Sequence, residues 1–416
     1  MKIKIESLGC RLNQSEIESV STELQNMGHE IVISGDADIY IINSCSVTGR
    51  SERKARQLIY RALDKTGGRD SKRIIVTGCA TESIKTDRNI TYVSNDHKYL
   101  IPEIIEGAAS GYEKMKPARF GYAAPLKCST NRVNLKIQDG CDNFCSYCII
   151  PYLRGEPQSR VFKDIISEFR LLLDNGYKEI ILTGVNIGKY NDAGRALPEL
   201  VAGILELQGE FRLHLTSLDP ESASDELISL FADRRMVKHL HLSLQSGSDS
   251  VLRRMNRPYT RAVYIDAVNK LKGIDPDFNF TTDVIVGFPG ETDEEFSDTV
   301  SIVKEAGFSH IHTFRYSPRP GTEAANMDDA VPEIVKTGRS KTIIDLYMKQ
   351  KDSFYRKFDG RTGTFLSEKS RGGVTAGFNG HYIPVEIAEK LPRNEFFNIR
   401  TEYSHGSYKL KGFIIK

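Results

Sequence analysis

The sequence contains no apolar run that approaches the roughly 18 residues needed for a membrane-spanning helix. Its first residues, MKIKIESLGC, contain no long apolar segment followed by a small-residue cleavage site, so we expect no secretory signal and a cytoplasmic location. Its 33 Gly and 15 Pro among 416 residues are too few for collagen or a low-complexity linker. Because 39% of the residues are hydrophobic, extensive disorder is also excluded. An ordinary globular protein of about two to four domains remains.

Cysteine is scarce and odd in number, with 7 residues in the chain, which excludes a fully paired disulfide scaffold. In a chain without an export signal, clustered cysteines are more often metal or redox ligands. Charge is nearly balanced, at +2, but unevenly distributed. Residues 339–416 contain 15 Lys and Arg but 8 Asp and Glu, a net charge of +7. A polyanion is therefore a candidate partner for the C-terminal part.

Three patterns of strands and helices follow one another along the chain. Residues 2–78 alternate strand and helix, with Asn13 as a possible N-cap, which predicts a parallel sheet. Residues 110–126 have weak periodicity and are predicted to be a linker. Six strand–helix units follow from residue 133, as expected of a partial or full parallel barrel. After a helix over 332–358, five short strands separated by turns predict a small all-β barrel.

The sharpest motif is GCDNFCSYC, in which Cys141, Cys145 and Cys148 directly follow a predicted strand. Three thiolates on one short loop can hold three irons of a [4Fe–4S] cluster, whereas a conventional cluster takes four cysteines. The fourth iron would then be open to S-adenosylmethionine (SAM), which binds through its amino and carboxylate groups. One electron from such a cluster cleaves the sulfonium and releases a 5′-deoxyadenosyl radical. The spacing therefore favours radical-SAM chemistry.

Two other readings of this motif stay open on spacing alone. Cys128 lies thirteen residues earlier and could complete a tetrahedral Cys₄ zinc site. A ferredoxin is less well supported, because the C-x2-C-x2-C-x3-C-P run is absent. A second trio, Cys10, Cys45 and Cys79, weighs against both readings. Each of these three cysteines follows the end of a predicted parallel strand, and such ends lie along one sheet edge.

The chain resembles the radical-SAM methylthiotransferase family over nearly its whole length. The matching segments, in order, are GCRLNQSE, INSCSVT, VTGCA, IQDGCDNFCSYCIIPYLRGEPQSR, LTGVNIGKY, HLSLQSGSDSVLRRMNRPYT, TTDVIVGFPGET and FRYSPRPGT. The resemblance implies an α/β fold: an N-terminal doubly wound parallel sheet domain over 1–110, a radical-SAM partial (β/α) barrel over 127–335, and a small C-terminal all-β, TRAM-like barrel over 360–416. It implies that Cys10, Cys45 and Cys79 hold a second, auxiliary [4Fe–4S] cluster. Cys128 matches no ligand position.

The resemblance also indicates which loops line the SAM site. Gly184, Val185 and Asn186 end one predicted strand, and Gln245, Ser246 and Gly247 end another. For Gly184 the plainer alternative is a turn glycine without a ligand. Arg154 and Arg160 could pair with the SAM carboxylate or with phosphate, and for them the plainer alternative is a surface ion pair. GFPGET is as compatible with a rigid turn as with a ligand loop. The predicted strand histidines at 239, 241, 310 and 312 are expected to line the barrel or to pack, and not to act as ligands.

A basic helix after Cys45 and the basic tail are the candidate RNA contacts. The helix contains Arg50, Arg53, Lys54, Arg56, Arg61 and Lys65, and the tail combines Lys409, Lys411 and Lys416 with Tyr403 and Phe413. A solvated helix face and a structural cap are the alternatives.

Three substrates are compatible with the family. GCRLNQSE resembles the branch that acts on N6-threonylcarbamoyladenosine at tRNA position 37, whereas the other branches typically carry GCQMN or GCPKN. Those branches act on N6-isopentenyladenosine in tRNA or on an aspartate of a ribosomal protein. The basic tail favours RNA over a basic protein. Low-potential flavodoxin or ferredoxin is the expected electron donor, and a non-catalytic iron–sulfur RNA-binding protein is the alternative from another class.

Overall fold

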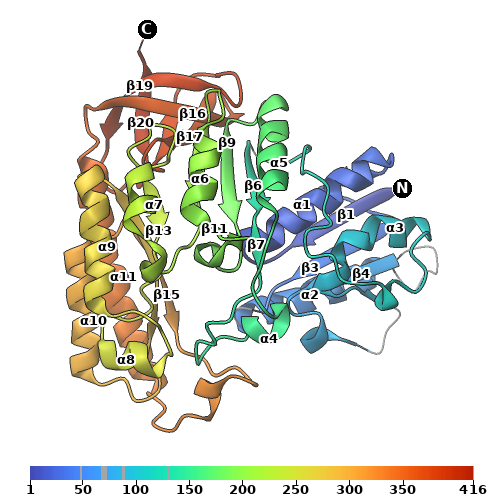
Figure 1. Ribbon diagram of the computed structural model, residues 1–416, viewed down its shortest axis with the longest axis horizontal. Coiled ribbons are helices and arrows are strands. Elements are labelled where there is room, and N and C mark those ends of the chain that lie inside the picture. The colour runs from blue at the N-terminus through green and yellow to red at the C-terminus, as the bar shows by residue number, and fades with distance from the viewer. Residues whose placement is uncertain (47–48, 67–72, 87–89, 129–130, 416) are drawn as a thin grey trace.

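The computed structural model describes residues 1–46, 49–66, 73–86, 90–128 and 131–415. Figure 1 shows three units in chain order: a sheet flanked by helices in blue, a larger open barrel in green to orange, and a small β-barrel in red. No described helix is both long enough and apolar enough to span a bilayer.

The N-terminal unit is a five-stranded sheet of order β2-β1-β3-β4-β5, and every pairing in it is parallel. Strand β3 is buried along its whole length because helices cover both sheet faces. Ile41 packs with residues of α1 and α3 on one face, and Ile42 packs with α2 on the other. The elements are β1 (Lys2–Ser7), α1 (Arg11–Asn26), β2 (Glu30–Val32), β3 (Ile39–Ser44), α2 (Gly49–Thr66), β4 (Arg73–Gly78), β5 (Thr91–Tyr92) and α3 (Ile101–Glu106).

Helix α1 begins earlier than the sequence predicts. Its N-cap is Cys10 and not Asn13, which lies within the first turn. The buried Asn13 side chain instead donates hydrogen bonds to Leu8 O at 2.9 Å and Ser44 O at 2.8 Å. The carboxamide thus ties together the chain segments that follow β1 and end β3, a role that a cap prediction from local sequence does not detect.

Six parallel strands form the open barrel, in two three-stranded sheets of order β12-β9-β6 and β13-β14-β15. Isolated bridges between Leu213 and Met236 and between Leu218 and Leu242 join the two sheets. All six predicted strands are present, but β13 is much shorter than its apolar pattern suggests. The strands are β6 (Arg132–Lys136), β9 (Glu179–Thr183), β12 (Arg212–Leu215), β13 (His239–His241), β14 (Asn279–Val286) and β15 (His310–Arg315).

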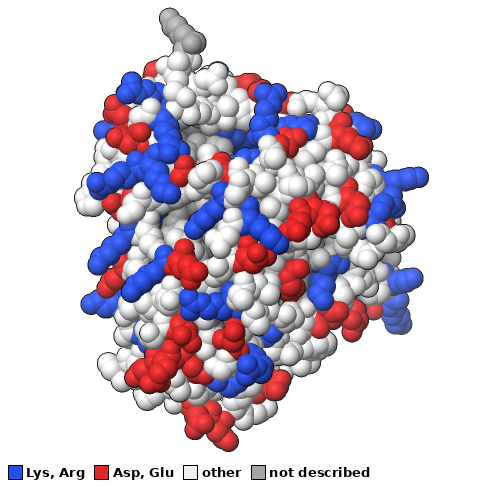
Figure 2. Space-filling model, turned by 60° about the vertical axis from the view of Figure 1, so that its left-hand side comes forward, with Lys and Arg blue, Asp and Glu red and all other residues white. Residues whose placement is uncertain are grey.

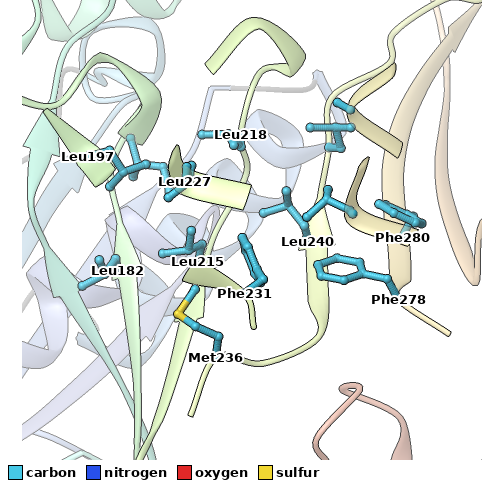
Figure 3. Close-up of a cluster of buried hydrophobic side chains, with 14 of the residues drawn as sticks. Leu182, Leu197, Leu215, Leu218, Leu227, Phe231, Met236, Leu240, Phe278 and Phe280 are labelled. Atoms are coloured by element: carbon cyan, nitrogen blue, oxygen red, sulfur yellow. The ribbon is translucent and has the colours of Figure 1, made fainter. Parts of the chain in front are cut away.

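The outer face of the barrel is its hydrophobic core. Leu182, Leu215, Leu240 and Phe280 point toward the helices, where they meet residues such as Leu227 (Figure 3). Strand side chains alternate between faces, so the intervening residues point into the barrel. We call these residues the inner face: Arg132, Lys136, Glu179, Arg212, His214, His239, His241, Thr281, Asp283, His310 and His312. The covering helices are α5 (Phe162–Asp174), α6 (Leu197–Leu205), α7 (Asp225–Leu230), α9 (Arg261–Ile274), α10 (Asp293–Ala306) and α11 (Glu333–Arg356).

The C-terminal unit is a closed five-stranded barrel that covers the end of the large barrel where the strands begin. At this end Asn131 donates to Ser367 O at 2.9 Å, Arg212 to Phe378 O at 2.8 Å, and Asn279 to His381 O at 2.8 Å. Helix α11 belongs to both cores, because Ile343 packs in the large one and Phe354 in the small one. The strands are β16 (Thr362–Arg371), β17 (Val374–Asn379), β18 (Pro384–Ile387), β19 (Phe396–Tyr403) and β20 (Leu410–Ile414).

Candidate active site

The loop of Cys141, Cys145 and Cys148 lies at the opposite end of the large barrel. It connects β7 (Gln138–Asp139) to the short helix α4 (Ile150–Arg154). Main-chain hydrogen bonds hold the loop at both sides: Cys141 N donates to Gly155 O at 3.0 Å, and Cys148 N to Cys145 O at 2.8 Å. Local backbone bonds of this kind fix where three side chains converge without using the side chains themselves.

The three thiols influence one another. Burial, followed by negative charge on Cys145 and Cys141, raises the pKa of Cys148 to about 12. Burial and Cys145 also raise the pKa of Cys141. Without a metal ion the thiols are favoured in their neutral form, and a bound metal ion would deprotonate them. Cysteine thiolates are the usual ligands of iron–sulfur clusters, so this set of three donors fits such a cluster.

Arg257 provides a positive charge on this loop. Its Nη1 donates to Cys145 Sγ at 3.2 Å, and it also pairs with Asp219. Asp219 in turn accepts hydrogen bonds from Asn143 and Asn186, each at 3.1 Å. Hydrogen bonds to a ligating sulfur and nearby charge tune the reduction potential of an iron–sulfur cluster.

Cys10, Cys45 and Cys79 also come together at one edge of the N-terminal sheet. Cys10 caps α1, and Cys45 and Cys79 directly follow β3 and β4. A Cβ built on Gly9 would lie 3.2 Å from Cys45 Sγ, so this glycine lets the backbone before Cys10 approach Cys45 closely. Burial raises the pKa of Cys10, and negative charge on Cys79 adds a smaller upward contribution.

A buried network of charges lies between the two trios. Arg154 donates to Cys79 Sγ at 3.4 Å and pairs with both Glu16 and Asp139 at 3.0 Å. Lys98 and Lys136 each contact Glu16 at 2.7 Å. Burial disfavours the Glu16 carboxylate, yet the three cations hold its pKa well below the usual value. Three cations against two carboxylates leave positive charge beside Cys79, which suits an anionic thiolate-bound cluster.

The geometry also bears on the zinc reading. Tetrahedral Zn–S bonds of about 2.3 Å require sulfur atoms about 3.8 Å apart. Within the described residues, the only three possible ligand atoms that all lie within 4.8 Å of one another belong to His241, Asp283 and His312, not to any cysteine trio. Cys128 Sγ donates to Pro125 O at 3.1 Å, and burial raises its pKa. Among the described residues, no cysteine trio has the close sulfur spacing of a single zinc site.

The predicted SAM-loop residues lie at the same barrel end as Cys141, but packing explains both glycines. A Cβ at Gly184 would come within 2.9 Å of Gln138 O, and one at Gly247 within 2.6 Å of Thr299 Cα. Asn186 N donates to Gln138 Oε1 at 2.8 Å, and Gln245 has a positive φ of 60°. Ser246 is fully buried and Val185 is partly buried. Their contact with SAM stays a prediction.

The two arginines predicted to bind SAM have protein partners. Arg154 is buried in the network described above, and Arg160 pairs with Glu168 at 2.5 Å. Their role toward SAM also stays a prediction. Sequence reasoning missed Glu16, Lys98, Asp139, Asp219 and Arg257, although Glu16, Asp139 and Arg257 lie inside the quoted motifs GCRLNQSE, IQDGC and MNRPYT. The position of these three charged residues inside the quoted motifs was the signal in the sequence that could have identified them.

Comparison with known proteins decides the family. Residues 135–303 match the Radical SAM superfamily, and residues 2–96 match a family described as uncharacterized protein family UPF0004. A threonylcarbamoyladenosine tRNA methylthiotransferase from Chlamydia pneumoniae is 36% identical over 92% of this chain and 91% of its own. The Bacillus subtilis protein of the same name is 34% identical over 98% and 96%. The chain belongs to the radical-SAM methylthiotransferase family. It is an enzyme, and its family implies SAM and a [4Fe–4S] cluster.

Other similarities are broader. A tRNA-2-methylthio-N(6)-dimethylallyladenosine synthase from Thermodesulfovibrio yellowstonii is 31% identical over 99% of this methylthiotransferase and 98% of that protein. Among solved structures, the radical S-adenosylmethionine methyltransferase TsrM from Kitasatospora setae superposes with a TM-score of 0.56 over 78% of this chain and 73% of that one. At 11% identity this likeness shows the fold alone. The expected fold class, a parallel sheet, a radical-SAM barrel and a closed β-barrel, is confirmed.

Proposed function

We propose that this enzyme adds a methylthio group to C2 of N6-threonylcarbamoyladenosine at tRNA position 37. The observation that carries the proposal is the agreement of relatives from Chlamydia pneumoniae, Thermotoga maritima, Bacillus subtilis and Aquifex aeolicus, all threonylcarbamoyladenosine tRNA methylthiotransferases at 34–36% identity over 87–98% of this chain. The dimethylallyladenosine synthases, at 31–34% identity, support the isopentenyl substrate as the second candidate.

Each cysteine trio has a distinct role in this proposal. Cys141, Cys145 and Cys148 would hold the cluster that reduces SAM, and Cys10, Cys45 and Cys79 would hold an auxiliary cluster with one iron open to sulfur. When bound, these groups supply the radical that activates an inert aromatic C–H bond and the sulfur that joins the carbon. The protein positions them, tunes their charge and excludes water. Arg257 acts on one trio and Arg154 on the other, through N–H donation to sulfur.

The proposal keeps three functional units. Residues 1–110 would bear the auxiliary cluster, 127–335 the SAM chemistry, and 360–416 the RNA contact. The segment between the first two units contacts the second, because Arg119 donates to Glu156 O at 2.8 Å and Lys136 Nζ lies 5.1 Å from the centroid of the Tyr122 ring. We expect the enzyme to act in the cytoplasm and to take electrons from a flavodoxin or ferredoxin.

The direct test uses purified enzyme and two RNA substrates. Anaerobically reconstituted enzyme, dithionite and SAM would be incubated with anticodon stem-loops carrying either threonylcarbamoyl- or isopentenyladenosine. We expect the 2-methylthio product, detected by nucleoside mass spectrometry, on the threonylcarbamoyl RNA and at least about tenfold less on the other. Preference for the isopentenyl RNA would contradict the proposed substrate. Release of 5′-deoxyadenosine without methylthio product on either RNA would contradict both candidate tRNA substrates.

The C-terminal barrel supports RNA contact through its exposed strands β19 and β20. Arg400 lies opposite Phe413 in their pairing, and Lys411 lies opposite Glu402. All four residues are exposed, Phe413 at 48%. On the face in Figure 2, Lys and Arg are mixed with Asp and Glu over the upper and middle parts, and a group of Asp and Glu lies near the lower end. Lys409 is paired with Glu386 at 2.6 Å. Lys416 and the Arg50 side chain lie outside the described residues.

Reversing charge on this surface should weaken tRNA binding. We expect Arg400→Glu with Lys411→Glu to lower affinity about tenfold near physiological salt. The slope of log affinity against log salt should fall by about one for each lost phosphate contact. SAM cleavage without RNA should be unchanged. Fluorescence anisotropy across a salt series measures both effects, with Lys270→Glu and Lys304→Glu on the outer helices as the matched control.

An unchanged slope in the Arg400/Lys411 variant would show that the barrel is a structural cap, and the exposed residues Arg53, Lys54 and Arg61 of α2 would become the leading RNA contact. Deleting the barrel is a poorer test. It would uncover the inner face where Arg212 and Asn279 now bond to it, and would destabilise the core shared through α11.

A further inference from the structure

The inner face of the large barrel is polar, unlike a closed parallel barrel that is filled by branched apolar side chains. His239 and His214 are buried, whereas His241 and Asp283 are partly exposed and His312 is exposed. His241 Nε2 lies 3.5 Å from Asp283 Oδ1. A polar, partly exposed lining suits a polar ligand better than a hydrophobic one.

One cation enters this interior from the N-terminal unit. Arg11 directly follows Cys10, and its Nη2 donates to the Tyr382 hydroxyl at 3.0 Å. The Tyr382 ring lies 4.5 Å from the His214 ring and 4.8 Å from the His239 ring. Positive charge on Arg11 adds to burial in lowering the pKa of both histidines. The Arg11 guanidinium thus lies beside Tyr382 and near the inner-face residues His214 and His239, although its helix belongs to another unit.

Arg11 differs from the neighbouring cations in its partners. Arg132 pairs with Glu368 at 2.5 Å, and Lys136 pairs with Glu16 at 2.7 Å. Arg212 is satisfied by carbonyl oxygens of the C-terminal barrel. Among the described residues, no carboxylate lies within 4.0 Å of the partly exposed Arg11, and its hydrogen-bond partner is the Tyr382 hydroxyl. The buried Glu179 is influenced by the charge of Arg11 but also by that of Arg132 and Arg212. No carboxylate is therefore paired with Arg11 alone, and its guanidinium can accept an anionic ligand.

Tyr382 is oriented to assist. Both Arg11 and Arg132 donate to its oxygen, so its own proton remains available to a ligand. The residue has a positive φ of 59°, a strained conformation for a bulky side chain, and its ring stacks on Phe378 with centroids 4.6 Å apart. Strain of this kind persists where the surrounding structure fixes a side chain in one place, often at a ligand site.

We propose that Arg11, assisted by the Tyr382 hydroxyl, binds the carboxylate of the threonylcarbamoyl group and so selects the anionic substrate. This inference rests on the proposed function. An isopentenyl group is neutral and apolar and would leave the guanidinium uncompensated, whereas a carboxylate forms two parallel N–H···O bonds with it. Arg11 directly follows Cys10 in the chain. Binding of the threonylcarbamoyl group by Arg11 would therefore also hold the attached adenine near the auxiliary trio.

The test compares two anticodon stem-loops, one with threonylcarbamoyladenosine and one with its methyl ester, which keeps the shape but removes the charge. For methylthio product formation, wild-type kcat/KM should be about 10- to 100-fold higher on the acid. Arg11→Gln should bring this ratio close to one, mainly by losing activity on the acid, and Arg11→Lys should restore part of it. Arg195→Gln, which removes an arginine paired with Asp192 at 2.8 Å on an outer hairpin, should keep the wild-type ratio.

Iron content and RNA-independent SAM cleavage are measured in every variant, because Arg11 adjoins Cys10. If Arg11→Gln loses iron, Tyr382→Phe replaces it, with an expected severalfold fall in the ratio. A wild-type enzyme that does not distinguish acid from ester, or an Arg11→Gln enzyme that retains both iron and the full ratio, overturns this inference. A wild-type enzyme that modifies neither of these RNAs contradicts the proposed function instead.

Discussion

Replacing Cys141, Cys145 and Cys148 together with alanine should abolish SAM cleavage and remove about four of about eight irons per chain, with an equal share of sulfide. These thiols lie on a loop that main-chain bonds hold in place, so their removal should leave the fold intact. The loss of 5′-deoxyadenosine should exceed 100-fold, because the other cysteine trio belongs to the N-terminal sheet and not to a loop of the radical-SAM barrel.

Iron and sulfide analysis, electron paramagnetic resonance of the reduced protein and chromatography of the SAM products measure this result. Cys128→Ala is the matched control, since Cys128 Sγ bonds to Pro125 O and should leave iron content near wild type. Zinc without sulfide in the wild-type protein, or loss of iron in the Cys128 variant, would contradict the ligand assignment.

Replacing Cys10, Cys45 and Cys79 with alanine should abolish methylthio transfer but not SAM cleavage. The remaining iron should be about half, SAM cleavage should stay measurable, and the methylthio product should fall below detection. The physical reason is separation: these thiols lie in the N-terminal sheet, and the link to the SAM loop passes through Arg154 and Asp139 without a shared cysteine.

Nucleoside mass spectrometry and 5′-deoxyadenosine in the same reaction measure this division. A stable variant is needed, so thermal unfolding should be followed in parallel, because Arg154 and Lys98 lose the Cys79 sulfur as a neighbour. Product at a normal rate in this variant would show that the auxiliary trio does not carry the sulfur that is transferred.

Tertiary structure explains where the sequence patterns misled. The apolar pattern over 238–246 predicts a long strand, yet β13 contains three residues. Beyond it the backbone turns through Gln245, whose φ is positive, and Leu244 N donates to the side chain of Thr282 in β14 and not to the β14 backbone. Gly247 resembles a ligand glycine, but α10 packs so closely that any side chain there would clash. Neither contact partner is near in sequence.

The sequence by itself determined the six ligand cysteines as candidates, the α/β class and the family, because ligand spacing and strand–turn boundaries are local properties of the chain. Only the tertiary structure decided what lies between the trios. The residues of the charge network are scattered over 139 residues of the chain, and each is of a type usually found at the surface: Glu16, Lys98, Asp139 and Arg154. They form ion pairs because a buried charge without water must be compensated by an opposite charge. The same holds for Arg11, which meets Tyr382 across 371 residues because the helix that follows Cys10 abuts the barrel that the C-terminal unit closes.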